Sequence, residues 1–263
     1  MIRVLMALVA LWGLQVSAIA QEASSEDAAT AFVLNNSTYV LYHEIGHLFV
    51  GEFGIPILGK EEDAADNVAT LLLLAAEADE ADYALIDSAD GWFLSDAASE
   101  DEAYEDAEFY GEHSLDVQRA FQIVCLMVGS NAEMFGDIAT EIGMDEERQQ
   151  SCEFDYAQSA QSWEAVLAPF ESDGSNSVEI NISYEPSVDY ADVVEFLEKT
   201  RFFEDAAEQI LNGYALPRPI TMRSTECGEA NAFYSYDEAE VVFCYELADH
   251  FYTLFDYAMA EEG

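Results

Sequence analysis

Two histidines one helical turn apart constrain this chain more than any other feature. They are His43 and His47 in the stretch His-Glu-Ile-Gly-His, and the whole chain has only 4 histidines. On an α-helix, side chains at i and i+4 share one face, so both imidazoles can reach one metal ion. Glu44 lies next to them, where a carboxylate can take a proton from an activated water. The pattern predicts a helix with two zinc ligands and a general base. Two surface histidines are the plainer alternative.

The third zinc ligand has to come from elsewhere, because a catalytic site uses three protein ligands and an open position. Val50 and Phe53 stand where metzincins carry glycine and histidine, which excludes that class. Downstream, Glu62 and Asp66 stand four residues apart in an E-x-x-A-D pattern. This pattern resembles the second zinc helix of gluzincins. The resemblance implies that Glu62 is the third ligand and that Asp66 bonds a histidine ligand, His43, fixing its tautomer.

Two alternatives stay open for this ligand. Asp63 is one residue away and could bind the metal in the manner of aspzincins. Glu62 could also belong to an ordinary acidic helix surface, since the chain has 54 acidic residues. The segment 51–59, with Gly54 and Pro56, is typical of a turn between two helices.

The first twenty residues are typical of a secretory signal. Arg3 precedes the apolar run 4–14, and Ala18-Ile19-Ala20 resembles a cleavage site. We expect a signal peptide at 1–20, a disordered lead at 21–30, and one domain at 31–263 that is exported to the periplasm or the medium. The apolar run is too short for a transmembrane helix, and no later segment is long enough to span a bilayer, so we expect no membrane span in the mature chain. A retained N-terminal anchor is the alternative.

The charge of the chain restricts its partners. Its 54 acidic and 8 basic residues give a net charge of −46. So negative a surface excludes nucleic acid as a partner and disfavours anionic membranes. A peptide or protein substrate that is basic or neutral should be attracted.

Four cysteines in an exported chain favour disulfides. Three pairings exist, and we favour Cys125–Cys152, between neighbouring helices, and Cys227–Cys244, across a hairpin. Free buried thiols are the alternative, and the absence of a CxxC spacing disfavours a cysteine metal site.

Apolar periodicity predicts an α+β domain in which helices predominate, with a small β-sheet. The acidic stretch 87–111 reads as a long surface loop. The expected helices are 36–53, 61–78, 115–129, 146–167, 192–212 and 248–258, and the expected strands are 177–184, 219–223 and 240–245.

Asn231-Ala232-Phe233-Tyr234, followed by the apolar segment 241–245, carries a second resemblance. It is similar to the N-A-[FY]-Y segment of neprilysin-like gluzincins. The resemblance implies that a buried Asn231 side chain and the Ala232 backbone hold the substrate main chain as an added strand. In those enzymes the segment precedes HExxH. Here it follows, which implies a circularly permuted gluzincin-like domain; an ordinary disulfide-clamped hairpin is the alternative.

The region 31–250 also resembles a bacterial family whose members are described as metallopeptidases by inference. The shared stretches are His113-Ser-Leu-Asp116-x-Gln118-Arg119, Cys125-Leu-x-x-Gly129, and Asn231-Ala-Phe-Tyr with Cys244-Tyr245-Glu246-Leu247.

These patterns predict one zinc ion per chain and hydrolysis of peptide bonds with Glu44 as general base. Gluzincins use a histidine or tyrosine from elsewhere in the chain to stabilise the transition state, and His113, Tyr234 and Tyr245 are the candidates here. A metal-binding interaction module without peptidase activity is the alternative function. A peptidase that acts on one dedicated target of the cell envelope is a third.

Overall fold

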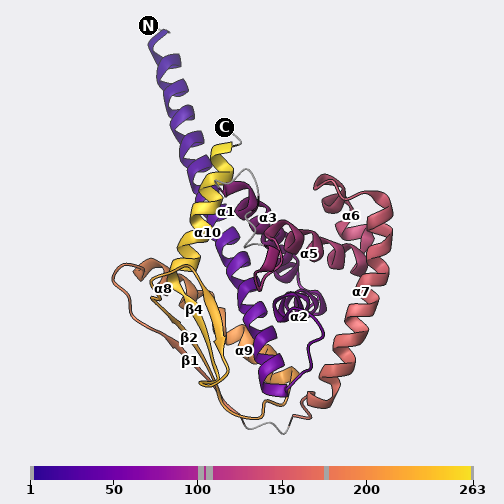
Figure 1. Cartoon of the computed structure of the whole chain (residues 1–263). Helices are drawn as coiled ribbons and strands as arrows, with labels where there is room; N and C mark the ends of the chain where they lie inside the picture. Colours follow the sequence, from indigo (N-terminus) through magenta and orange to yellow (C-terminus); the bar gives the residue numbers. More distant parts are fainter. Residues whose placement is uncertain (1–2, 100–103, 105–108, 175–177, 262–263) are drawn as a thin grey trace.

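Helix α1 (Arg3–Phe53) is the axis on which the other elements pack. The computed structural model describes residues 3–99, 104, 109–174 and 178–261. Helices lie along one side of α1, and the sheet and the last helix lie along the other (Figure 1). Tyr39, Ile45 and Leu48 have no exposed surface, because this part of α1 is covered from both sides. The central helix therefore carries the HExxH motif inside the core.

The helical side of the molecule is held together by a disulfide and by capped helix starts. Cys125 and Cys152 form the disulfide that we predicted. Asn131 and Asp145 accept hydrogen bonds from backbone N–H groups three residues on, and each bond fixes the start of a helix. The helices on this side are α2 (Glu61–Ala75), α3 (Asp79–Ala98), α5 (Asp116–Ser130), α6 (Ala132–Glu141) and α7 (Glu146–Leu167).

A four-stranded sheet with the strand order β1-β2-β4-β3 forms the other side. β1, β2 and β4 are parallel, and β3 runs antiparallel to β4 at the edge. The predicted disulfide between Cys227 and Cys244 links the start of the β3–β4 hairpin to the end of β4. The strands are β1 (Ile180–Tyr184), β2 (Ile220–Thr225), β3 (Ala232–Ser235) and β4 (Glu240–Cys244), with α8 (Ala191–Lys199) and α9 (Phe202–Gly213) between β1 and β2.

Helix α10 (Tyr245–Glu261) begins directly after β4 and returns along α1 (Figure 1). Its Phe255 packs on Phe32 of α1, with ring centroids 5.7 Å apart. The C-terminal helix is thereby placed beside the helix that carries the histidines.

Helix α1 includes residues 21–30, for which we expected a disordered lead. Two expectations about the secondary structure of the domain were wrong. We expected a surface loop over 87–111, but its residues as far as Ala98 belong to α3. The buried face of α3 consists mostly of small residues such as Ala81, Ala84 and Ser88. Residues 100–103 and 105–108 of that loop lie outside the described residues.

The second difference is the expected helix over 192–212, which is broken into α8 and α9. Arg201 at the break has a left-handed backbone with a φ of 55°. A non-glycine residue rarely adopts this conformation, so nothing in the local sequence announces the break.

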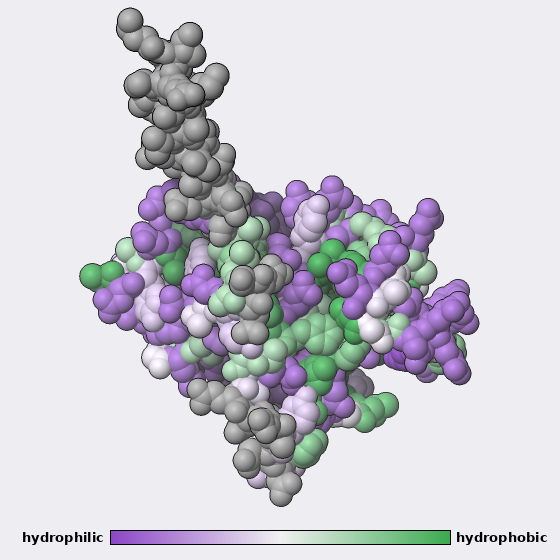
Figure 2. All heavy atoms as spheres, turned by 90° about the horizontal axis from the view of Figure 1, so that it is seen from above, coloured by the Kyte–Doolittle hydropathy of each residue, from purple (hydrophilic) through white to green (hydrophobic). Residues whose placement is uncertain are grey.

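The largely hydrophilic surface agrees with the 54 acidic residues of the chain. Hydrophilic residues cover much of the face seen from above, with apolar residues in small groups among them (Figure 2). Within the described part of the chain, no helix combines the length and the apolar character needed to cross a membrane.

Candidate metal centre

His43 and His47 point their Nε2 atoms at one place on the surface of α1. These two atoms lie 3.1 Å apart. The Oε2 atom of Glu62, on α2, lies 3.1 Å from Nε2 of His43 and 3.2 Å from Nε2 of His47. Donor atoms about 2.1 Å from a tetrahedral zinc ion lie about 3.4 Å from one another. The triangle of two nitrogens and one oxygen therefore fits three ligands of a zinc site with its fourth position open.

A close contact between α1 and α2 allows Glu62 to reach the histidines. A Cβ atom on Gly46 would lie 2.8 Å from the Cα atom of Ala65 and 3.0 Å from its carbonyl oxygen. Gly46 belongs to the HExxH motif and Ala65 to the E-x-x-A-D pattern. The lack of a side chain at Gly46 therefore lets the faces of α1 and α2 that carry the candidate metal ligands come together.

The acidic alternative Asp63 is turned away from the triangle. Its Oδ1 atom accepts a hydrogen bond from the Ser114 hydroxyl at 2.7 Å. One group of donor atoms that lie close enough together to hold an ion consists of His43, His47 and Glu62. Glu62 is therefore the acidic residue that joins the histidines in this structure.

Asp66 lies behind His43, as the gluzincin resemblance implied. Its Oδ1 atom is 2.7 Å from Nδ1 of His43. In the neutral imidazole, this contact favours a proton on Nδ1 and a lone pair on Nε2, the atom that faces His47 and Glu62. Nδ1 of His47 makes the equivalent contact with Glu61 at 2.9 Å, a partner that we did not predict.

The site stabilises positive charge. Burial opposes the charged form of His43, but hydrogen bonds to Asp66 and Glu62 raise its pKa to about 9. Burial also opposes ionisation of Glu62, yet hydrogen bonds from His113, His43 and His47 hold its pKa well below the usual range. An environment that favours a proton on the imidazole also suits a divalent cation.

Glu44 lies beside the triangle without belonging to it. Its side chain is buried, and burial raises its pKa, which nearby His43 and His47 lower in part. The backbone of Tyr234 in β3 also lowers the pKa of the Glu44 carboxyl group. The general-base candidate therefore lies between α1 and the edge strand of the sheet.

The cleft at this place has two lobes. The inner lobe has a volume of about 470 Å³ and extends toward α3 and α10. The outer lobe has a volume of about 790 Å³ and extends toward Glu61 and Tyr236. Five residues line both lobes and mark the point where they meet: His43, Glu44, His113, Asn231 and Ala232. A chain lying along the cleft would pass directly over Glu44.

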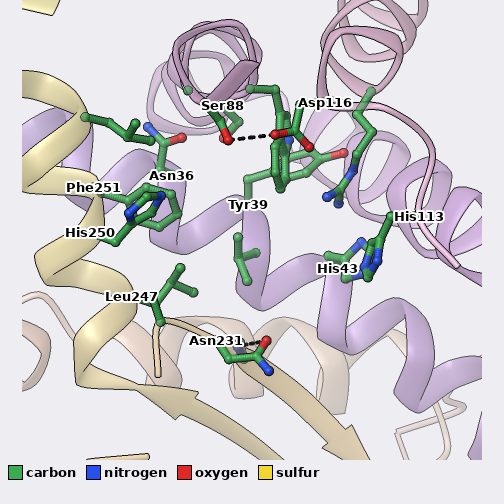
Figure 3. A pocket seen from close by; sticks show the side chains of 18 of the residues that line it. Asn36, Tyr39, His43, Ser88, His113, Asp116, Asn231, Leu247, His250 and Phe251 are labelled. Carbon is green, nitrogen blue, oxygen red and sulfur yellow. Dashed lines mark hydrogen bonds between the residues drawn. The ribbon is translucent and has the colours of Figure 1, made fainter. Parts of the chain in front are cut away.

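The segment around Asn231 thus lies beside the HExxH helix, far from it in sequence (Figure 3). We expected a buried Asn231 side chain, and this is wrong, because the side chain is exposed. Its Oδ1 atom accepts a hydrogen bond from the backbone N–H of Ala232 at 2.9 Å. The Asn231 amide therefore stands at the cleft surface with its Nδ2 group toward solvent and Glu229.

Comparison with known proteins agrees with this geometry. The sequence matches the model of a family described as "putative metallopeptidase" over residues 2–167 and 184–262. The chain belongs to this metallopeptidase family. The description of the family supports, at a coarse level, a metal-dependent peptidase that acts on peptides or proteins. No curated protein and no solved structure matches the chain.

The three candidates for the transition-state donor of this metallopeptidase lie in different places. His113 lies at the cleft, with Nε2 2.9 Å from Oε2 of Glu62. The Nζ atom of Lys60 donates a hydrogen bond to the backbone carbonyl oxygen of His113 at 2.8 Å. Tyr234 lines the outer lobe, where its hydroxyl bonds Glu52. His113 is therefore the candidate nearest to the metal ligands.

Tyr245 does not belong to the site of the metallopeptidase, and this expectation was wrong. The residue is fully buried, and its hydroxyl donates to the carbonyl oxygen of Glu185 at 2.7 Å. It lies at the junction of β4 and α10, where its ring faces the ends of β1 and β2 instead of the cleft.

Sequence reasoning missed two supports of the site. Arg119 of α5 donates from Nε and Nη2 to Asp66, both at 2.8 Å, and its guanidinium lies 3.7 Å from the ring centroid of Trp92. Arg218 donates to Glu52 near the end of α1 at 2.6–3.0 Å, which ties that helix to the sheet. One signal was available: basic residues are rare in this chain, so each is a candidate partner of a buried acid.

Proposed function

We propose that this metallopeptidase is an exported, zinc-dependent enzyme of the gluzincin type, circularly permuted, that hydrolyses peptide bonds. The observation that carries the proposal is the triangle of His43, His47 and Glu62 with Glu44 beside it on the same helix. Two nitrogens and one carboxylate oxygen are a ligand set that suits Zn²⁺. The two disulfides support an oxidising compartment outside the cytosol.

A zinc ion bound there would supply Lewis acidity toward the scissile carbonyl and would lower the pKa of a water molecule. The residues of the chain do the rest. The Glu44 carboxylate takes the proton of the attacking water and passes it to the leaving amine nitrogen. His113 donates from its ring nitrogen to the oxygen that gains negative charge. Asp66 and Glu61 hold the two imidazoles in the tautomer that leaves Nε2 free.

The edge strand β3 binds the substrate backbone in this proposal. Its partner β4 occupies one side, while residues 231–234 line the cleft on the other. An extended peptide would add there as a further strand, with main-chain hydrogen bonds that tolerate many sequences. The net charge of −46 favours basic or neutral peptides.

Glu44→Gln tests the proposal. The substitution removes the proton acceptor and keeps the shape, so the variant should bind one zinc per chain, as measured by elemental analysis, while losing peptide hydrolysis. Glu112→Gln is the matched control, because Glu112 lines the outer lobe with an exposed carboxylate and is not among the grouped metal-ligand candidates. If wild type cleaves no peptide library with zinc bound, the chain is a metal-binding interaction module.

A further inference from the structure

The inner lobe of the cleft is a pocket with mostly apolar walls. Val40, Trp92, Leu247, Phe251 and Leu254 contribute side chains from α1, α3 and α10. Its volume of about 470 Å³ lies in the ~300–1,000 Å³ range of ligand pockets. Because it opens at Glu44 and His43, a side chain in this pocket would belong to a residue next to the scissile bond.

The side-chain amide of Asn36 offers its oxygen to this pocket as a hydrogen-bond acceptor. Asn36 is 3% exposed and lines the wall next to Ser88 and Phe251 (Figure 3). Its Nδ2 group donates to the carbonyl oxygens of Phe32 at 2.9 Å and of Asp87 at 3.1 Å. These two carbonyl oxygens fix the orientation of the Asn36 amide, because a flipped amide would place Oδ1 against both of them. Within the described residues, no group donates to Oδ1 of Asn36.

An occupant that donates a hydrogen bond to this oxygen is favoured over an apolar occupant, because an apolar group would bury the oxygen without a partner. Gly91 leaves the space in which this oxygen lies, because a Cβ atom there would be 2.1 Å from it. The pocket therefore presents a fixed acceptor among apolar groups.

The charges around the pocket favour a neutral occupant. Asp116 and Glu44 would repel an acidic side chain. The Asp116 carboxylate already accepts the Ser95 hydroxyl at 2.6 Å and faces Arg119, whose guanidinium lines the same wall. A basic side chain would compete with Arg119 for that carboxylate.

We propose that this pocket recognises an aromatic substrate side chain with a hydrogen-bond donor, tyrosine above all, whose O–H donates to Oδ1 of Asn36. The proposal rests on the proposed function, since it presumes a peptide in the cleft. A site that bonds a substrate hydroxyl discriminates against the analogue that lacks it, because its own polar group is then left unpaired. Tyrosine should therefore be preferred to phenylalanine by about tenfold.

Two probes separate this proposal from peptidase activity. p-Cresol and toluene have the shapes of the tyrosine and phenylalanine side chains, and NMR titration of the zinc-loaded protein measures their affinities without catalysis. In parallel, kcat/KM is measured for peptides that differ only in tyrosine, phenylalanine, tryptophan, leucine or lysine beside the cleaved bond. Wild type should favour p-cresol and the tyrosine peptide by about tenfold.

Asn36→Leu should reduce both ratios to about one. The matched control is Asn35→Leu, because Asn35 also bonds Asp87, at 2.6 Å to its carboxylate, but does not line the pocket. This control should keep both preferences. Equal affinity of wild type for the two probes overturns the proposal whether or not Asn36→Leu folds, and so does a preference for the lysine peptide. If no peptide is cleaved while the preference for p-cresol depends on Asn36, the peptidase proposal fails and the pocket assignment stands.

Discussion

Asp66 and Arg119 form a buried bidentate ion pair, with both N–O distances at 2.8 Å. The other contact of Asp66 is Nδ1 of His43 at 2.7 Å, so one carboxylate joins a zinc-ligand candidate to a fixed positive charge. Burial opposes ionisation of Asp66, but Arg119 and then His43 hold its pKa well below the usual range. The carboxylate is thus ionised whenever the protein is folded near neutral pH.

Asp66→Ala should therefore lower both zinc affinity and stability. Loss of the hydrogen bond to His43 should cost about 10–100-fold in zinc affinity or activity. Arg119 would be left as a buried unpaired charge, which should lower the free energy of unfolding by about 3–5 kcal/mol. Competition with a zinc chelator and urea denaturation measure the two effects. Unchanged values in both would show that Asp66 supports neither the metal nor the fold.

The metal ligands can be ranked by substitution. The double variant His43→Ala/His47→Ala should contain no zinc by elemental analysis, because it removes two of three donors. Glu62→Gln should weaken zinc binding strongly and Asp63→Asn only slightly, since Asp63 bonds Ser114 instead. The reverse order would transfer the third ligand position to Asp63, and wild-type zinc content in the double variant would end the proposal.

Gly46→Ala should disturb the metal centre from a distance. The new methyl group would press on the backbone of Ala65 at 2.8 Å and push α2, with Glu62, away from the histidines. We expect a loss of about 1–3 kcal/mol in stability together with weaker zinc binding. Gly59→Ala is the control, because a Cβ atom at 59 meets nothing within 4 Å. Equal zinc affinity in the two variants would contradict the close contact.

Glu52→Gln should give a pH-dependent change in stability. Burial raises the pKa of Glu52, but hydrogen bonds from Arg218 and Tyr234 outweigh it and lower the pKa below 4.5. A depressed carboxyl pKa stabilises the fold above the unfolded value and loses this effect as the pH falls through the folded value. The stability difference between wild type and Glu52→Gln should thus be full at pH 7 and shrink below about pH 4.5. Urea denaturation between pH 7 and pH 3 measures it. Glu195→Gln, in a surface pair with Lys199, should change little.

Asn231→Ala tests the substrate-binding edge. If the Asn231 amide holds the peptide backbone, kcat/KM should fall by a similar factor for peptides of unrelated sequence, with zinc content and Tm nearly unchanged. Glu229→Ala is the neighbouring control, because Glu229 is exposed and accepts a hydrogen bond from the Asn231 amide. A loss confined to one class of peptide would assign Asn231 to side-chain recognition instead.

The sequence alone determined the local parts of the site. His43, Glu44 and His47 share a helix face because of their spacing, and a helix converts that spacing into proximity without help from the fold. The E-x-x-A-D resemblance added Glu62 and Asp66 for the same reason. Both disulfides were predictable as well, since each joins elements that are near neighbours along the chain.

Only the tertiary structure decided which distant groups meet around the candidate metal site. Arg119 reaches Asp66 across 53 residues, and Tyr234 reaches Glu52 across 182. Nothing in the local periodicity of α5 or β3 specifies these contacts, because they depend on how helices and sheet pack around α1. Asn231 is exposed and Tyr245 buried for the same reason. Local spacing fixes which side chains leave one face of a helix, whereas packing over the whole chain fixes what they meet.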